Sequence, residues 1–218
     1  KIVRPKTHLV LTLQEGDEEA YLMRYALGST FLYNLLIRPW YRLVFHSADS
    51  VTAISQYLKT RAEDAGAEVP VDVIPIGVDL NRFKACPPRE PDGTIRLVTA
   101  SRLVEKNAVG DVIEALMLLP PNVEFSILGG GHLEGELRHR VKELGLESRV
   151  HFFGVFTQEQ EFELFQKSDI FIRPALSEGL GIAYLNAMAV GLPVIGTPVG
   201  GIPDFLKTGE TGWLCQVN

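Results

Sequence analysis

Residues 177–195 bring together a carboxylate, an amide and two closely spaced glycines. Gly179 and Gly181 come just before a segment with helical character, and the first N–H groups of a helix are free to bind an anion. Because glycine has no Cβ atom, a phosphate group can approach such a loop closely. Glu178 stands beside the glycines, where its oxygens could accept hydrogen bonds from hydroxyl groups. The stretch therefore predicts a ligand that carries both phosphate and hydroxyl groups.

Strand signals flank this loop and would hold it at the edge of a sheet. Residues 170–172 form an apolar run that predicts a buried strand, and residues 193–196 predict another. Gly191 followed by Pro193 predicts the end of the helix between them. Asn186 lies about two turns into that helix, near the side of the ligand. A strand, a glycine loop and a helix that carry these polar groups suit a nucleotide sugar.

Residues 178–186 resemble the Glu-x7-Glu signature of the retaining glycosyltransferases of family 4, which have the GT-B fold of two Rossmann-like domains. The resemblance implies that Glu178 is catalytic and contacts the donor sugar, and that the glycine-rich backbone after it holds the diphosphate. At the position of the second Glu, which binds ribose, this chain has Asn186, which offers one hydrogen-bond donor group and one acceptor instead of two acceptors. The donor-binding residues implied in this stretch are Gly179, Leu180, Gly181, Ile182 and Asn186.

A second group of polar residues follows an apolar run that predicts a strand over residues 95–100. Arg102 and Lys106, at the carboxyl end of that strand, could hold a diphosphate as negative charge builds up on a leaving group. The segment resembles the family's Gly-Arg-Leu-Val-x2-Lys-Gly segment, with Asn107 at the Lys position and Ala108 at the last Gly. The resemblance implies catalytic roles for Arg102 and Lys106. The alternative is a solvated Lys106 and an Asn107 that caps the following helix.

A run of three glycines, residues 129–131, follows another predicted strand. With Gly135 it gives a G-x-G-x3-G spacing, which is a weak sign of a dinucleotide site because no acid ends the next strand. In the resembling family a glycine-rich loop here borders the donor sugar and the diphosphate, and the backbone after the next strand borders the base. The resemblance therefore adds Gly130, Gly131, Phe153 and Gly154 to the donor-binding residues. Tight-turn glycines with no ligand are the alternative.

A loop near the start of the chain is the candidate for the acceptor side. Residues 8–13 predict a strand, and residues 14–17 follow its carboxyl end, where α/β folds place ligands. In the resembling family a loop of this kind faces the acceptor cleft, which implies acceptor-side roles for Gln14, Glu15, Gly16 and Asp17. The alternative is a turn in which Asp17 caps a helix.

Residues 30–46 are rich in large apolar and aromatic side chains, with Trp40 between Arg38 and Arg42. Pro39 predicts the start of a helix, because proline is favoured at the first helical position. Aromatic residues beside arginines could mark contact with a membrane surface or a lipid-linked acceptor. We favour a core helix whose arginines extend their charged ends into solvent.

The order of the elements predicts an α/β fold of GT-B type, with two Rossmann-like domains and parallel sheets. Residues 75–83 resemble the family's Pro-Asn-Gly-Val-Asp-x3-Phe element, which ends the N-terminal domain, with Ile76 in place of Asn. Residues 84–94 hold three prolines and a glycine and predict a linker. The strands expected after the linker are residues 95–100, 123–128, 150–153, 169–173 and 193–196, and the helices are residues 107–118, 133–144, 157–167 and 182–190.

These signals divide the chain into part of an acceptor-side domain over residues 1–83 and a nucleotide-sugar-binding domain over residues 95–218. The resemblance implies that the first strand and glycine loop of the N-terminal domain, and the last helices of the C-terminal domain, are missing here. Within the helix expected over residues 157–167, a solvated face is predicted for Glu159, Glu161 and Glu163.

Composition and residue spacing limit the classes of ligand and the cellular location that we expect. The net charge of the 218 residues is −6, so general nucleic-acid binding is not expected. His132 and His151 are isolated, and Cys86 and Cys215 lack metal-ligand spacing, so we expect no metal and reduced, cytoplasmic thiols. No apolar run is long enough to span a membrane, and no signal-peptide pattern is present. We therefore expect a cytoplasmic protein, with the inner face of the membrane as a peripheral contact.

The resemblance implies transfer of a hexose from a UDP- or GDP-linked sugar to a hydroxyl of a glycan or lipid-linked acceptor, with retention at the anomeric carbon. In the family's usual account the leaving diphosphate helps to deprotonate the acceptor, so no cofactor is needed. One alternative is an epimerase or phosphorylase of the same fold, although no clear acid/base pair is present. Another is a non-catalytic nucleotide-binding relative, which the departures at Ile76, Asn107 and Asn186 would suit.

Overall fold

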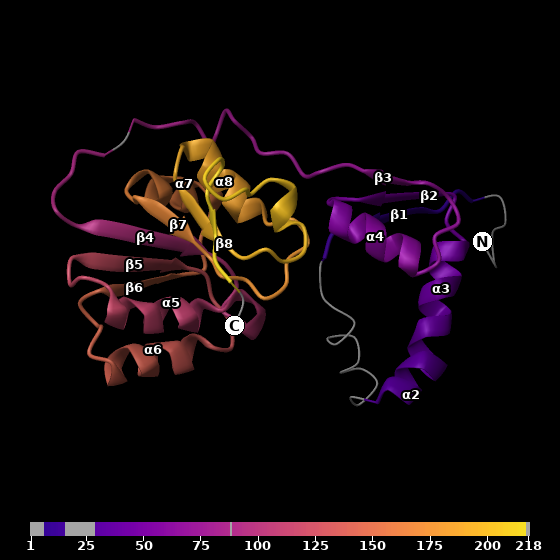
Figure 1. Cartoon of the computed structure of the whole chain (residues 1–218), viewed down its shortest axis with the longest axis horizontal. Helices are drawn as coiled ribbons and strands as arrows, with labels where there is room; N and C mark the ends of the chain where they lie inside the picture. Colours follow the sequence, from indigo (N-terminus) through magenta and orange to yellow (C-terminus); the bar gives the residue numbers. More distant parts are fainter. Residues whose placement is uncertain (1–6, 16–28, 88, 217–218) are drawn as a thin grey trace. The chain divides into compact units, whose positions relative to one another are not determined.

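The computed structural model describes residues 7–15, 29–87 and 89–216 of the 218-residue chain (Figure 1). Contacts along the backbone divide the chain into two units. Unit 1 comprises Lys1–Ile76, Ser177–Leu180 and Gly200–Asp204, and unit 2 comprises Gly77–Leu176, Gly181–Val199 and Phe205–Asn218. The domain boundaries expected at residues 83 and 95 stay a prediction.

Unit 1 contains a three-stranded parallel sheet in the order β1-β2-β3. Its strands are β1 (Val10–Leu13), β2 (Ser50–Ala53) and β3 (Val71–Val73). Parallel strands require crossover connections, which are helical here. Among the described residues that connect these strands, the helical segments are α2 (Thr30–Leu32), the π-helical turn Tyr33–Ile37 and α3 (Arg38–His46) before β2, and α4 (Gln56–Asp64) between β2 and β3.

Ser55 and Pro39 lie at or near the starts of two helices of unit 1. Ser55 caps α4, because its hydroxyl accepts a hydrogen bond from the N–H of Leu58 at 3.3 Å. Pro39 lies in the first turn of α3, but helical structure already starts at Thr30, so the proline does not begin the helix as expected. Proline lacks an N–H group, and the π-helical turn Tyr33–Ile37 widens the helix just before it.

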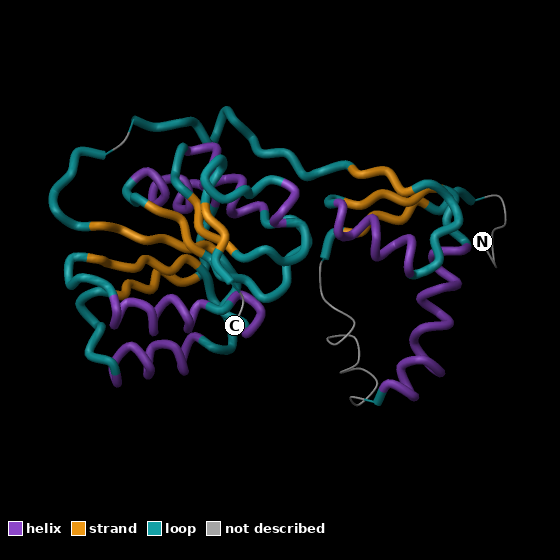
Figure 2. The backbone as a smooth tube through the Cα atoms, viewed as in Figure 1, coloured by secondary structure: helices purple, strands orange, loops and turns teal. Residues whose placement is uncertain are grey.

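Unit 2 contains a six-stranded sheet in the order β6-β5-β4-β7-β8-β9, and all of its strand pairs are parallel. The strands are β4 (Ile95–Ala100), β5 (Val123–Leu128), β6 (Val150–Gly154), β7 (Ile170–Ile172), β8 (Val194–Gly196) and β9 (Trp213–Leu214). The helices are α5 (Val109–Ala115), α6 (Glu134–Glu143), α7 (Gln158–Gln166) and α8 (Ile182–Val190). Helices α5 and α6 cover one face of this sheet, and α7 and α8 cover the other (Figures 1 and 2).

The core of unit 2 has one apolar layer on each face of the sheet. Phe125, Ile127 and Ile113 are fully buried in the layer that α5 and α6 cover. On the other face the ring of Phe171 packs edge-on against Phe165 of α7 and Tyr184 of α8, with centroid separations of 5.6 and 5.1 Å. These contacts fix the two helices that carry the candidate site residues.

The alternation of strand and helix predicted from residue 95 onward is confirmed. The α/β fold with parallel sheets is confirmed as well. Two local differences stand out. The helix expected over residues 107–118 is shorter, because 3₁₀ turns at Glu105–Asn107 and Leu116–Leu118 flank α5. The strand β9 was not predicted, and its two residues add a short strand at the edge of the sheet.

Candidate functional site

The order of strands in unit 2 creates a switch point between β4 and β7. From β4 the chain continues outward through β5 and β6, then returns to β7 on the other side of β4. The loops after two such strands leave in opposite directions, and the crevice between them is the usual ligand site of an open α/β sheet. Residues 101–108 follow β4 and residues 173–176 follow β7, and the N–H of Leu176 donates to the carbonyl of Lys106 at 2.7 Å. The structure therefore brings these two loops together.

Arg102, Lys106 and Asn107 lie on the loop after β4. The side chain of Arg102 is exposed and that of Lys106 is half-buried. Asn107 is buried, and its Nδ2 donates to the carbonyl oxygen of Arg102 at 2.6 Å. The expected alternative role of Asn107 as a helix cap is wrong, because Ala108, in a left-handed conformation with φ of 48°, precedes α5. Asn107 instead folds the loop that carries the two cationic side chains.

The glycines after β5 pack closely against that same loop. A Cβ atom on Gly129 would overlap the carbonyl oxygen of Ser101, and one on Gly131 would overlap that of Leu103. The N–H of Leu103 also donates to the carbonyl of Gly130 at 3.0 Å. Close approach of backbone thus explains two of the three glycines, whereas a Cβ on Gly130 would meet side chains, the nearest being Cγ2 of Val155 at 3.1 Å.

Phe153 and Gly154 end β6 at the same edge of the sheet. The ring of Phe153 is exposed, and the carbonyl of Gly154 accepts from the N–H of Gly129 at 2.8 Å. A hollow of about 230 Å³ lies beside Phe153, lined by Leu128, Phe153, Phe156, Gln160, Glu163, Leu164 and Lys167. The position is open enough for a planar ring to lie against Phe153.

Helix α8 begins as the glycine pattern predicts. Gly181 precedes it with φ of 93°, a left-handed conformation that favours glycine, and no side chain caps the first turn. The N–H of Tyr184 bonds to the carbonyl of Gly181, and the N–H groups of Ile182 and Ala183 lie in the first turn, where a helix offers them no carbonyl partner of its own. Ile182 is 40% exposed. This helix end can donate hydrogen bonds to an anion.

Asn186 lies on the buried side of α8, where it meets an acid of α7. Asn186 is 6% exposed and Glu161 is 5% exposed, and Nδ2 of Asn186 lies 3.2 Å from Oε2 of Glu161. Burial raises the pKa of Glu161 to about 7, although the hydrogen bond from Asn186 and the charge of Arg173 act in the opposite direction. The expectation of a solvated Glu161 is therefore wrong.

Arg173 is a second buried charge that the sequence interpretation missed. Its Nη1 donates to the carbonyl of Ala100 at 3.4 Å, which joins the carboxyl ends of β7 and β4. Its guanidinium lies 4.6 Å from the centre of the Tyr184 ring, and the Tyr184 hydroxyl donates to the carbonyl of Arg173. An arginine at the end of an apolar strand was the signal available in the sequence, since such a residue needs partners if it is buried.

The loop that carries Glu178 belongs to unit 1. Glu178 is half-buried, and its Oε1 accepts from the N–H of Gly179 at 3.1 Å. The N–H of Gly201 donates to the carbonyl of Glu178 at 3.3 Å. Cβ atoms on Gly200 and Gly201 would overlap the carbonyl oxygens of Glu178 and Gly179, respectively. Gly200 and Gly201 therefore allow the backbone of their own segment to lie directly against the loop that carries Glu178.

The acceptor-side residues are described only in part. Gln14 and Glu15 are exposed and follow β1, whereas Gly16 and Asp17 lie outside the described residues. Their acceptor-side roles stay a prediction.

The helical region over residues 30–46 does not form the core helix that we favoured. Tyr33 and Phe45 are buried, but Phe31 is 73% exposed and Trp40 is 68% exposed. Further large apolar side chains of the region are exposed as well, namely Leu35, Leu36, Leu43 and Val44. These exposed side chains form an apolar face of α2 and α3 that the described residues leave open to solvent, which a core helix would not show.

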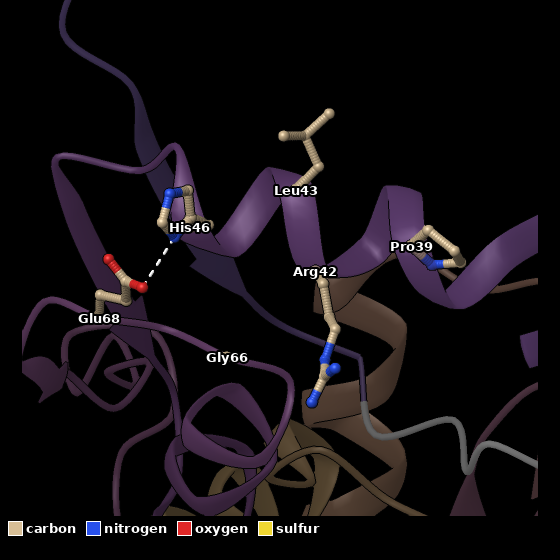
Figure 3. Close-up of a pocket in the computed structure, with 6 residues that line it drawn as sticks. All are labelled: Pro39, Arg42, Leu43, His46, Gly66 and Glu68. Carbon is tan, nitrogen blue, oxygen red and sulfur yellow. Dashed lines mark ion pairs between the residues drawn. The ribbon is translucent and has the colours of Figure 1, made fainter.

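A hollow of about 440 Å³ lies under α3 (Figure 3). Nδ1 of His46 and Oε1 of Glu68 form an ion pair of 2.8 Å at one side of it. Arg42 extends from α3 toward the loop of Gly66, while Leu43 points the other way (Figure 3). A neighbouring hollow of about 280 Å³ is lined by Tyr33, Arg38, Tyr41, Arg42, Arg61, Asp64 and Ala65. Three arginines, Arg38, Arg42 and Arg61, therefore line this second hollow.

Comparison with known proteins identifies the family. Residues 84–218, more than half of the chain, match the model described as glycosyl transferases group 1. The chain belongs to this family. The matched range includes the loops after β4, β5 and β7 and the helices α7 and α8 described above.

The group 1 relatives are longer than this chain. It is 31% identical over 194 residues to the GDP-mannose-dependent alpha-(1-6)-phosphatidylinositol monomannoside mannosyltransferase of Mycolicibacterium smegmatis, covering 78% of this chain and 50% of the relative. It is 31% identical over 153 residues to the amylovoran biosynthesis glycosyltransferase AmsK of Erwinia amylovora, covering 66% of this chain and 38% of the relative. The chain spans about half the length of the curated relatives it matches.

The fold is that of GT-B glycosyltransferases. A crystal structure of Anabaena Alr3699/HepE in complex with UDP and glucose aligns with a TM-score of 0.78 and 23% identity, over 97% of this chain and 58% of that one. This chain therefore represents part of the full-length fold. Within residues 7–15, 29–87 and 89–216, no helix is long and apolar enough to cross a membrane. Among those same residues no three His, Cys, Asp or Glu side chains gather as metal ligands would.

Proposed function

We propose that this chain contains the sugar-donor site of a retaining family 4 glycosyltransferase, which transfers a hexose from a nucleotide diphosphate sugar to a hydroxyl acceptor. The observation that carries the proposal is the junction of the loops after β4 and β7, joined by the hydrogen bond of 2.7 Å between Leu176 and Lys106. That junction lies at the switch point of the sheet, where ligands bind in this fold class. Membership of group 1 supports the same assignment.

The diphosphate would lie between the cations after β4 and the start of α8. Arg102 and Lys106 would stabilise the negative charge that develops as the sugar leaves, and the N–H groups from Leu180 to Ile182 would donate to phosphate oxygens, while that of Gly179 is held by Glu178. Removing one such preorganised hydrogen-bond donor typically lowers the rate by about 10²–10³-fold. Charge stabilisation is therefore expected to supply a large part of the rate enhancement.

The sugar and the nucleoside would lie on either side of that diphosphate. Glu178 would accept hydrogen bonds from the hydroxyls of the donor sugar, and Asn186 from those of the ribose. Gly130 and Gly131 would border the sugar and diphosphate, while Phe153 and Gly154 would border the base. Leu180, between Glu178 and α8, would complete the donor-binding loop.

No protein nucleophile is assigned to the reaction. The leaving diphosphate would take the proton of the acceptor hydroxyl on the face from which it departs, which gives retention of configuration. The protein would then act by holding donor and acceptor in position and by stabilising charge. We assign no metal ion or cofactor to this step.

Relatives give the classes of substrate to test. One is named as GDP-mannose-dependent and acts on a phosphatidylinositol monomannoside by its name, and a protein of the same fold was crystallised with UDP and glucose. We therefore propose a UDP- or GDP-linked hexose as donor and a glycan or lipid-linked acceptor. The exposed loop of Gln14 and Glu15, with Gly16 and Asp17, is the proposed acceptor side.

The test is titration calorimetry of the full-length protein with UDP, GDP and ADP in EDTA, followed by transfer assays. Selective binding of one nucleotide would support a metal-free donor site and name the donor class. Glu178→Ala should abolish transfer and leave nucleotide affinity within about threefold, because its contacts are with the sugar. Glu159→Ala, on the exposed side of α7 and outside the hollow beside Phe153, is the matched control for expression and folding. If Glu178→Ala removed nucleotide binding as well, the role assigned to Glu178 would be wrong.

We also propose that the protein is cytoplasmic and that the apolar face of α2 and α3 contacts the surface of an anionic membrane. Trp40 and Phe31 would enter the interface, and Arg38 and Arg42 would face lipid phosphates. In a Trp213→Phe background, Trp40 fluorescence of the full-length protein should shift to shorter wavelength with phosphatidylglycerol vesicles and not with phosphatidylcholine vesicles. An unchanged spectrum with both would contradict the contact.

A further inference from the structure

The pair formed by Glu161 and Asn186 is not explained by packing alone. Both side chains are buried, and they meet between α7 and α8 with Nδ2 of Asn186 at 3.2 Å from Oε2 of Glu161. Acids are rarely buried in proteins unless they are paired, and apolar side chains usually join two helices at least as well. An acid at this position therefore calls for a further function.

Glu161 decides which way round the amide of Asn186 is held. An asparagine amide has one end that donates and one that accepts hydrogen bonds, whereas an ionised carboxylate can only accept. Glu161 therefore selects the orientation in which Nδ2 points toward α7. The opposite end, Oδ1, accepts no hydrogen bond from the side chains and backbone of residues 7–15, 29–87 and 89–216. A ligand at α8 would thus meet an acceptor and not a hydrogen-bond donor.

We propose that Glu161 is a positioning residue that holds Asn186 with its Oδ1 turned toward the ribose hydroxyls of the nucleotide. The inference rests on the proposed function, in which Asn186 binds ribose. The proposal explains how the neutral Asn186 can stand where the resembling family has a second Glu. An amide that is held in one orientation presents its oxygen to a hydroxyl as an acceptor, as a carboxylate would. No contact between Glu161 and the nucleotide is required.

The surroundings of Glu161 make the orientation sensitive to pH. Arg173, at the end of β7, and Asn186, on α8, favour its ionised form, while burial favours the protonated form and raises the pKa to about 7. On its own helix, Glu159 and Glu163 are exposed. The protonated acid gains an O–H group that can donate to Oδ1, which would allow the amide to turn. Ribose recognition should therefore strengthen as the pH rises from 6 to 8.

The experiment compares a nucleotide with its 2′,3′-dideoxy form, because only the former has the hydroxyls that Asn186 would bind. The full-length protein is titrated with UDP and with GDP, and the tighter of the two is then compared with its dideoxy analogue. Glu161→Leu should weaken the ribose nucleotide about tenfold, the loss of one hydrogen bond in a buried site, and leave the dideoxy affinity unchanged. Glu159→Leu, on the exposed face of the same helix, should change neither affinity.

Two further readouts separate positioning from a merely structural role. In the double variant Glu161→Leu/Asn186→Glu, the new carboxylate needs no orienting partner, so the preference for the ribose nucleotide should return. In wild-type protein the ratio of ribose to dideoxy affinity should rise between pH 6 and 8, and it should stay flat in Glu161→Leu. The ratio cancels the titration of the phosphate groups, which both ligands share.

Each outcome decides the inference. Equal losses of both affinities in Glu161→Leu would show that the acid only supports the fold, and unchanged affinities would show that it has no role; either result overturns the positioning role while nucleotide binding stands. If the wild-type protein bound neither UDP nor GDP, the proposed donor site itself would be refuted, and the inference with it.

Discussion

The glycines after β5 offer a test of whether packing or a ligand explains them. Gly131 has an ordinary backbone conformation, but an added Cβ would overlap the carbonyl oxygen of Leu103. Because the obstacle is backbone and not the end of a side chain, Gly131→Ala must move the loop that carries Arg102. Overpacking of this kind costs about 1–3 kcal/mol, and a backbone obstacle places the expected loss near 3 kcal/mol.

Gly130 is the matched control in the same loop. A Cβ there would lie 3.1 Å from Cγ2 of Val155, whose side chain is 87% exposed and can rotate away. Gly130→Ala should therefore change the free energy of unfolding by less than about 1 kcal/mol. If a phosphate approaches this backbone as proposed, the same variant should weaken nucleotide binding by about tenfold or more, since the methyl group would occupy the space of the ligand.

The assay is urea unfolding in a Trp40→Phe background, so that Trp213 of β9 reports on unit 2, together with nucleotide titration of each variant. Gly131→Ala should lower the urea midpoint strongly, and Gly130→Ala should lower only the nucleotide affinity. If Gly131→Ala kept the wild-type midpoint and merely weakened nucleotide binding, close packing against Leu103 would not be the reason for this glycine. The reasoning from backbone approach would then fail.

Three further predictions concern unit 2. Burial raises the pKa of Glu161 from 4.5 to about 7, so the protonated acid adds to the free energy of unfolding of the wild type fully below pH 4.5, and this addition is lost as the pH rises through 7. Glu161→Gln removes the titrating group, so the variant should not show this loss. Urea midpoints at pH 5 and 8 should show wild type losing up to about 3 kcal/mol relative to the variant. Tyr184→Phe should cost about 1 kcal/mol at a single pH, because its hydroxyl donates to the Arg173 carbonyl. Gly135→Ala, in the exposed first turn of α6, should raise the melting temperature and the stability by about 0.5 kcal/mol.

The strands of unit 2 could be predicted because a buried parallel strand is apolar along its length. Residues 123–128 and 95–100 match β5 and β4 residue for residue. The start of α8 after Gly181 could be predicted for a different local reason, because glycine adopts a φ of 93° without strain. Local chemistry and burial agreed at these places, and sequence reasoning succeeded there.

The role of Asn107 could not be read in the same way. Its side chain bonds to a carbonyl five residues earlier, and the positive φ falls on Ala108, a residue type that rarely adopts one. Asparagine before a helix is a common cap, so the local pattern favoured the wrong partner. Only the path of the whole loop after β4 decides which group the amide meets.

The burial of Glu161 was missed although the sequence held a signal for it. Residues two apart on a helix point to different sides, so Glu159, Glu161 and Glu163 could not share one face. Glu161 instead shares its face with Phe165, four residues on, which is fully buried. The run of acids suggested solvent, but helical periodicity placed the middle acid in the core.

A buried acid between α7 and α8 also bears on how a neutral residue can stand where the resembling family has a second Glu. Near pH 7 and above, Glu161 stabilises the fold less than an apolar side chain would, because burial disfavours its charge. A hydroxyl or an amide at that position could satisfy Asn186 with less cost, but each of these can both donate and accept, and would leave the amide free to turn. Only a carboxylate holds it one way round. The acceptor that a single Glu provides in the family would thus be divided between Asn186, which would bind the ribose, and Glu161, which would orient it, and this division would make nucleotide recognition depend on pH close to neutrality.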